Sequence, residues 1–118
     1  MLFRSNHSLS MLLFHSLSGF LNDKDVKAFL EDLKKTIFTG LITPDEYATV
    51  YDFYFFSFID QEKTFYGTQV YFDTLTNRTR VQKLFNNLEI NDLRRSIWLY
   101  NFDCYLFNMD YLKPINYE

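Results

Sequence analysis

The chain has 118 residues, a hydrophobic content of 47% and a formal net charge of -3. This length is common for one domain, and this composition excludes an intrinsically disordered chain. An isoelectric point of about 5.3 also disfavours a dedicated nucleic-acid-binding protein, for which a basic surface is typical. The sequence therefore predicts a single globular domain over residues 1–118.

Aromatic side chains are the unusual component, with 14 Phe, 9 Tyr and 1 Trp. Each large ring can bury about 150–250 Å². A chain of this size has few enclosed positions for so many rings, so some are expected at the surface, where clustered rings usually mark an interface. The alternative is that the Tyr rings are half-buried and keep their hydroxyls in water.

The first two predicted helices lie in the N-terminal third. A helix is predicted over residues 8–19, because apolar residues recur there at helical spacing. A second helix begins at Asn22 or Asp23, and Gly40 provides its left-handed stop. The apolar stripe of the second helix is formed by Val26, Phe29, Leu30, Leu33 and Ile37.

A third helix is predicted over 44–59. Thr43 and Glu46 form a capping box, and Pro44 suits the first helical position. Apolar residues follow at helical spacing, although the segment from Thr49 onward is dense in residues that favour strands. Residues 28–47 (AFLEDLKKTIFTGLITPDEY) resemble a short helical hairpin found near the ends of many bacterial and phage proteins; the resemblance assigns no family.

The C-terminal half is harder to interpret. Residues 64–74 alternate like a strand, but the conformation of 64–75 stays undecided. The spacing of Val81, Leu84, Phe85 and Leu88 predicts a helix over 79–88. A long helix is predicted over 92–111, capped by Asn91 and ended by Pro114. The predicted fold class is all-α, a small bundle of four to five helices. The alternative is α+β, with a short antiparallel meander in 50–84.

The sequence offers little for catalysis. His7 and His15 are about 12 Å apart along a helix, too far to share a metal ion. Cys104 is the only cysteine, so no internal disulfide forms and a reducing, cytoplasmic location is expected. No segment reaches the apolar length of a membrane span. We therefore predict no enzyme activity, cofactor, metal, small-molecule substrate or membrane partner.

The predicted function is non-catalytic protein binding or assembly, of the kind that small phage, viral or mobile-element proteins provide. The partner is another protein or a second copy in a homo-oligomer. Ring-rich and cationic residues are enriched at binding hot spots. The predicted protein-binding residues are Tyr51, Tyr54, Phe55 and Phe58, followed by Arg94, Arg95 and Trp98.

Charge is unevenly distributed, which leaves two alternatives open. Five acidic residues and no basic ones fall between 45 and 62, and five basic residues fall between 78 and 95. The basic segment could follow a phosphate backbone as a nucleic-acid accessory site. The residues of that alternative are Arg78, Arg80, Lys83, Arg94 and Arg95. Otherwise the acidic and basic segments pack together and neutralise each other.

Overall fold

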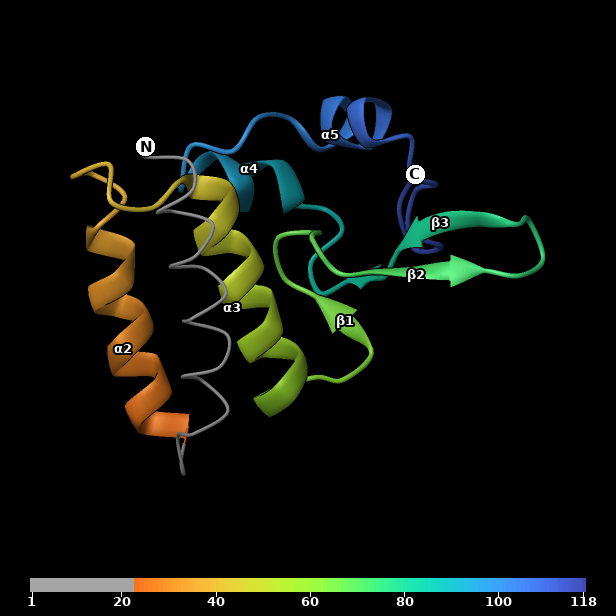
Figure 1. Cartoon of the computed structure of the whole chain (residues 1–118). Helices are drawn as coiled ribbons and strands as arrows, with labels where there is room; N and C mark the ends of the chain where they lie inside the picture. The colour runs from red at the N-terminus through yellow and green to blue at the C-terminus, as the bar shows by residue number, and fades with distance from the viewer. Residues whose placement is uncertain (1–22) are drawn as a thin grey trace.

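The computed structural model describes residues 23–118, so the helix predicted over 8–19 lies outside the described residues. Figure 1 shows two long antiparallel helices, a projecting β-hairpin and two shorter helices. The elements in chain order are α2 (Asp23–Lys35), α3 (Pro44–Phe58), β1 (Lys63–Thr64), β2 (Val70–Asp73), β3 (Arg78–Val81), β4 (Lys83–Leu84), α4 (Ile90–Arg95) and α5 (Phe102–Met109).

The α2–α3 hairpin follows its local sequence signals. Gly40 has φ +76°, which confirms the predicted left-handed stop after α2. The capping box at α3 is also confirmed: Glu46 N–H donates to Thr43 Oγ1 and Thr43 N–H donates to Glu46 Oε1, both at 3.1 Å. Packing against α3 buries the inner residues of the α2 stripe and of the following turn, which are Val26, Leu30, Leu33 and Ile37.

The prediction of an all-α bundle is wrong, because the described part of the chain is α+β. β2 and β3 pair antiparallel, and the two-residue strands β1 and β4 pair parallel. The alternative class, α+β, agrees with this structure, but of the short antiparallel meander in 50–84 only the β2–β3 hairpin is present. Residues 50–58 remain in α3 because its cap and its buried face outweigh the strand preference of its rings.

The helix predicted over 79–88 is wrong: these residues form most of β3, the two-residue strand β4 and a non-helical stretch over 85–88. Val81 lies opposite Val70 in the hairpin, and its N–H donates to the carbonyl of Leu112. Phe85 and Leu88, which complete the helical spacing, are exposed. The spacing therefore marks no buried helical face, and pairing with distant residues decides the conformation.

The helix predicted over 92–111 is interrupted. Residues 96–101 are not helical, and Trp98 has φ +65°. Asn91 does not cap α4; its Oδ1 accepts the N–H of Phe102 at the start of α5. Phe107, which lies within the helix predicted over 92–111, is 86% exposed. The predicted long helix is therefore divided into two shorter ones, α4 and α5.

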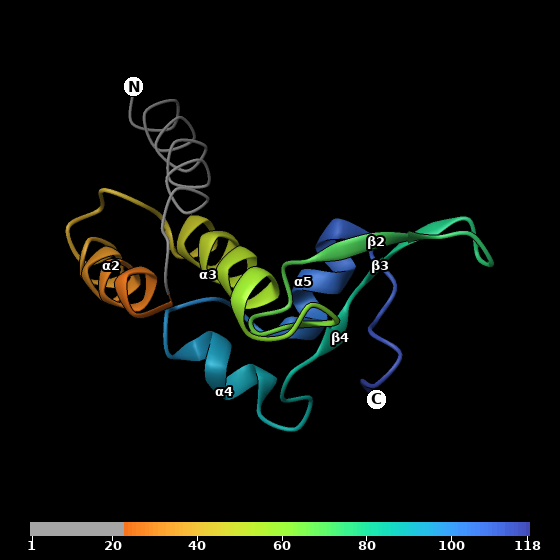
Figure 2. The ribbon, with the colours of Figure 1, turned by 90° about the horizontal axis from the view of Figure 1, so that it is seen from below.

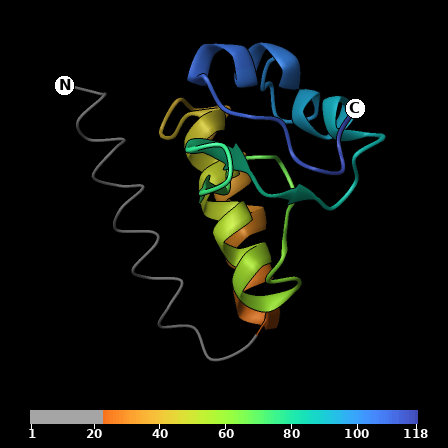
Figure 3. The same cartoon turned by 90° about the vertical axis from the view of Figure 1, so that its right-hand side faces the viewer.

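Two groups of buried residues hold the structure together. The larger joins α2, α3, Tyr66 and the residues flanking Trp98, and the smaller joins β3, β4, α4 and α5. Figure 3 shows α4 and α5 near the N-terminal end of α3. Among residues 23–118, none of the helices has the length and apolar character needed to cross a membrane.

Candidate functional site

The rings of the described residues divide between the core and the surface. Five are buried, namely Tyr47, Tyr54, Phe55, Tyr66 and Phe102. Nine are exposed, namely Phe38, Phe56, Phe58, Tyr71, Phe72, Phe85, Trp98, Tyr100 and Phe107. The remaining rings are half-buried. Exposed ring surface is therefore abundant, and the question is where it is organised.

The first-choice binding residues on α3 serve mostly inside the molecule. Tyr54 and Phe55 are buried, Tyr51 is half-buried, and Phe58 is exposed. The Tyr51 ring contacts Tyr54 with centroids 5.6 Å apart, and Tyr54 stacks on Phe58 at 5.6 Å. The helix places these rings in one continuous row, and of Tyr51, Tyr54 and Phe58 only Phe58 is exposed.

Asp52, on the buried side of α3, fixes the segment that follows β1. Its two carboxylate oxygens accept hydrogen bonds from the backbone N–H groups of Phe65, Tyr66 and Thr68, and from the hydroxyls of Thr64 and Thr68. Burial raises the pKa of Asp52, and these hydrogen bonds oppose that rise. A carboxylate so fully bonded is a structural centre.

Arg94 is the second buried charge, 1% exposed. Its Nε donates to the carbonyl of Tyr100 at 3.0 Å, and Nη1 donates to the carbonyl of Tyr66 at 2.7 Å. The guanidinium carbon lies 4.7 Å from the centroid of the Tyr105 ring and 5.5 Å from that of Phe102. Burial lowers the pKa of Arg94. Its Nη2 has no hydrogen-bond partner within the described part of the chain.

Arg94 and its neighbours hold the turn that presents Trp98. Trp98 N–H donates to the carbonyl of Arg95 at 3.0 Å, and Leu99 N–H donates to that of Arg94 at 2.9 Å. This pattern is a Schellman motif, with Trp98 at the left-handed position that glycine normally occupies. Ile97 and Leu99 on either side are buried, so the backbone must turn the indole outward.

The exposed indole meets a second exposed ring. Trp98 is 56% exposed and Phe38 is 74% exposed, and their ring centroids lie 4.6 Å apart at an interplanar angle of 85°. We name this pair of residues the Phe38–Trp98 surface. Phe38 belongs to the connection between α2 and α3, and Trp98 to the connection between α4 and α5. These two connections run close together (Figure 1).

Sequence reasoning found Trp98 but missed Phe38 and the role of Asp52. Ile37 and Phe38 are adjacent and equally apolar, so spacing alone cannot say which of them enters the core. For Asp52 a signal existed, since it is a single acid within the ring-rich run of α3. A lone charge on an apolar face is stable there only when hydrogen-bond donors surround it.

The basic residues are largely occupied. Arg78 pairs with Asp110 at 2.9 Å, Arg80 with Asp73 at 2.9 Å and Arg95 with Asp92 at 2.8 Å. With Arg94 buried, Lys83 is the one residue of the predicted basic set that has neither an ion pair nor burial in the described part. The acidic partners of these three arginines all lie outside the acidic 45–62 segment.

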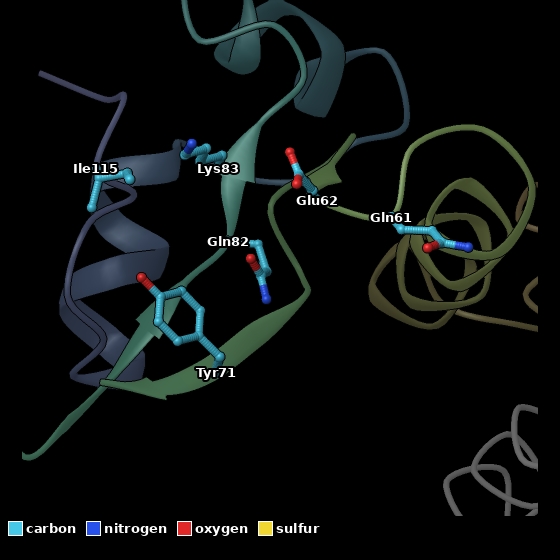
Figure 4. Close-up of a pocket in the computed structure, with 6 residues that line it drawn as sticks. All are labelled: Gln61, Glu62, Tyr71, Gln82, Lys83 and Ile115. Carbon is cyan, nitrogen blue, oxygen red and sulfur yellow. The ribbon is translucent and has the colours of Figure 1, made fainter. Parts of the chain in front are cut away.

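Surface hollows offer space but no reactive cluster. One, of about 280 Å³, is formed by Gln61, Glu62, Tyr71, Gln82, Lys83 and Ile115 (Figure 4). Residues 23–118 contain no group of three or more His, Cys, Asp or Glu side chains placed to hold a metal ion. His7 and His15 lie outside the described residues. Comparison of the chain with protein-family models, curated proteins and solved structures gave no match.

Proposed function

We propose that this chain is a non-catalytic protein-binding module that uses the Phe38–Trp98 surface as its contact site. The observation that carries the proposal is the left-handed backbone of Trp98, φ +65°, at an exposed indole. A bulky residue in this region costs about 1–3 kcal/mol, and such strain concentrates at functional sites. A glycine there would remove the strain but would leave no side chain for recognition.

The chemistry of the surface favours a protein partner. Tryptophan is among the residues most enriched at binding hot spots, because a large rigid ring buries much area for little lost entropy. Phe38 contacts the indole edge-on, so the Trp98 ring is partly oriented before binding. Arg95, 73% exposed, lies three residues before Trp98 and can supply a polar contact at the rim.

Three other predicted residues, Arg94, Tyr51 and Tyr54, support this surface instead of forming it. Arg94 donates to the carbonyl of Tyr100, just after the turn, and to that of Tyr66, between β1 and β2. The Tyr51 and Tyr54 rings belong to the α3 core that Ile97 and Leu99 join. Phe58 stays a prediction as a separate contact. A cytoplasmic location also stays part of the proposal, since the exposed thiol of Cys104 suits a reducing compartment.

Trp98 is the only tryptophan of the chain, so its fluorescence reports directly on this surface. Peptides selected from a random display library for binding to the protein should shift the Trp98 emission to shorter wavelength and protect it from iodide quenching. The Phe38→Ser substitution, which retains the indole, should raise the dissociation constant of these peptides at least about tenfold, a loss of about 1.4 kcal/mol in binding free energy.

The matched control is Phe107→Ser, which removes another highly exposed ring from α5. Peptide binding should survive this change. The proposal fails if the library yields no binding peptides, or if the selected peptides leave Trp98 emission unchanged and bind the Phe38→Ser variant as well as the native chain.

A further inference from the structure

The outer edge of β2 carries backbone groups that the hairpin does not use. Gln82 N–H donates to the carbonyl of Gln69 at 2.9 Å, directly beside the Val70–Val81 pair. Hydrogen-bonded and non-hydrogen-bonded pairs alternate along an antiparallel ladder. The N–H and C=O groups of Val70 and Phe72 therefore point away from β3.

The two edges of the hairpin differ. The outer edge of β3 is covered, because Val81 N–H donates to the carbonyl of Leu112 and Leu112 N–H donates to that of Thr79. In residues 23–118, no hydrogen bond satisfies the outward groups of Val70 and Phe72. The side chains of Val70, Tyr71 and Phe72 are also exposed and largely apolar, and Phe72 is 57% exposed. Open apolar edges of this kind pair with another strand.

We propose that β2 of a second copy of this chain pairs antiparallel with this edge, about a two-fold axis, to form a four-stranded sheet across a homodimer. The outward backbone N–H and C=O groups of Val70 form hydrogen bonds with those of Phe72 of the second copy. By symmetry, the outward groups of Phe72 form hydrogen bonds with those of Val70 of the second copy. This register places Tyr71 opposite Tyr71 of the second copy, in a non-hydrogen-bonded pair. The proposal concerns a surface other than the Phe38–Trp98 surface and does not rest on it.

The side chains of β2 complement themselves in this register. Val70 faces Phe72 of the second copy, and a β-branched residue opposite an aromatic one is a favourable cross-strand pair. Asp73 faces Gln69 of the second copy, so no like charges meet. The Asp73 carboxylate is already held by Arg80 Nε at 2.9 Å. A symmetric dimer needs such a self-complementary patch, which an unrelated peptide would match only by chance.

The position of the hairpin leaves this edge accessible. Figures 1 and 2 show the β2–β3 hairpin projecting away from the helices. β3 lies between β2 and the C-terminal segment, with which it pairs through Leu112. A second copy can therefore approach β2 without displacing any element that the structure describes.

Register-specific cross-linking tests the proposal. Tyr71→Cys is made in a Cys104→Ser background, because Cys104 is an exposed free thiol. Cβ atoms opposite each other in an antiparallel pair lie about 4.5–5.5 Å apart, close to the separation that a disulfide needs. Mild oxidation should link Tyr71→Cys chains into a dimer on a non-reducing gel. The matched variant Phe72→Cys should cross-link far more slowly, because Val70 of the second copy faces it.

Light scattering across a concentration series gives the second measurement. Val70→Pro removes an outward N–H that the hairpin does not use, so the fold is retained and the dimer dissociation constant should rise at least about tenfold. Phe107→Ser should leave the dimer intact. If circular dichroism shows that Val70→Pro unfolds, Phe72→Lys takes its place as the edge-blocking variant.

The proposal is overturned if the native chain is monomeric at every concentration, or if Phe72→Cys cross-links as readily as Tyr71→Cys. The fluorescence of Trp98 separates this result from the proposed protein binding. Dimerisation through β2 should leave Trp98 emission unchanged, whereas a partner at the Phe38–Trp98 surface should shift it.

Discussion

Two turns of this molecule share one hydrogen-bond pattern and differ in the residue at the left-handed position. After α2, Gly40 N–H donates to the carbonyl of Ile37 and Leu41 N–H donates to that of Thr36. After α4, Trp98 and Leu99 donate in the same way to residues three and five positions before them. The first turn has glycine at its left-handed position, and the second has the largest side chain of all.

The difference shows that the Trp98 turn depends on contacts with residues outside the turn itself. Gly40 adopts φ +76° without steric cost, and a Cβ built there would meet nothing within 4 Å. At Trp98 the cost must be offset by burial of Ile97 and Leu99 and by the Arg94 hydrogen bonds to the carbonyls of Tyr100 and Tyr66. A third turn, at Asp110 with φ +57°, lies between these extremes because Asp tolerates this conformation better than Trp.

The largest effect is expected from Arg94→Ala, which removes the support of the Trp98 turn. It deletes two hydrogen bonds from a charged group to backbone carbonyls and two ring contacts at a buried site, so we expect a loss of about 3–5 kcal/mol in the free energy of unfolding. Urea denaturation measures it. Arg95→Ala is the matched control: that side chain is 73% exposed and forms an i,i+3 ion pair, and its loss should cost less than about 1 kcal/mol. Equal effects would show that the Trp98 turn needs no support from Arg94.

The next effect is expected from Asp52→Asn, which tests the loop that positions Tyr66 for Arg94. The substitution replaces one carboxylate oxygen by an NH₂ group, which is a donor. This donor would face N–H and hydroxyl groups that now donate hydrogen bonds to Asp52. Urea denaturation should show a loss of about 1–3 kcal/mol. Asp32→Asn, at an 81% exposed side chain on α2, should change stability little. A small loss at Asp52 would contradict its role as a structural centre.

The pH dependence of this loss follows from the raised pKa of Asp52. A carboxyl whose pKa is higher in the folded state binds its proton more tightly there, so its contribution to stability falls as pH rises above the unfolded pKa of about 3.9. The difference in unfolding free energy between the native chain and Asp52→Asn should therefore shrink as pH rises above about 4. Urea titrations at several pH values measure it, and a difference that grows with pH would reverse the assignment.

Gly40→Ala tests the turn that glycine fills. Alanine in the left-handed region costs about 1–2 kcal/mol, although the site offers room for the methyl group. Thermal unfolding should show the loss, and Gly40→Asn should show a smaller one because Asn accepts this conformation. If Gly40→Ala were neutral, the left-handed position would carry no cost at either turn.

Trp98→Gly should have the smallest net effect on stability. The change relieves the backbone strain and removes the ring contact with Phe38, worth about 0.5–1.5 kcal/mol, so the two contributions nearly cancel. Trp98→Ala loses the ring but keeps most of the strain, and should be less stable than Trp98→Gly by about 1–2 kcal/mol. Thermal unfolding of the two variants isolates the strain at this position. Equal stability would show that Trp98 stores none.

The α2–α3 hairpin could be predicted because its signals are local. A glycine stop, a capping box and a proline act within a few residues of the helix ends that they define. Trp98 could be named as a binding candidate from residue type alone. Its pairing with Phe38 could not, since 60 positions separate the two rings in the sequence.

The C-terminal half depended on contacts that residue spacing does not encode. Val81 has the spacing of a helical residue, but strand partners at Val70 and Leu112 determine its conformation. Asn116, near the end of the chain, likewise fixes the backbone of Leu84. Its side-chain Oδ1 accepts the N–H of Leu84, and its Nδ2 donates to the carbonyl of Leu84. Local residue order was enough to set where α2 and α3 end and begin, because caps and stops act through hydrogen bonds between near neighbours. Which apolar residues are buried, and which ring is turned outward, was set by tertiary contacts alone, because burial depends on neighbours that folding brings from far along the chain.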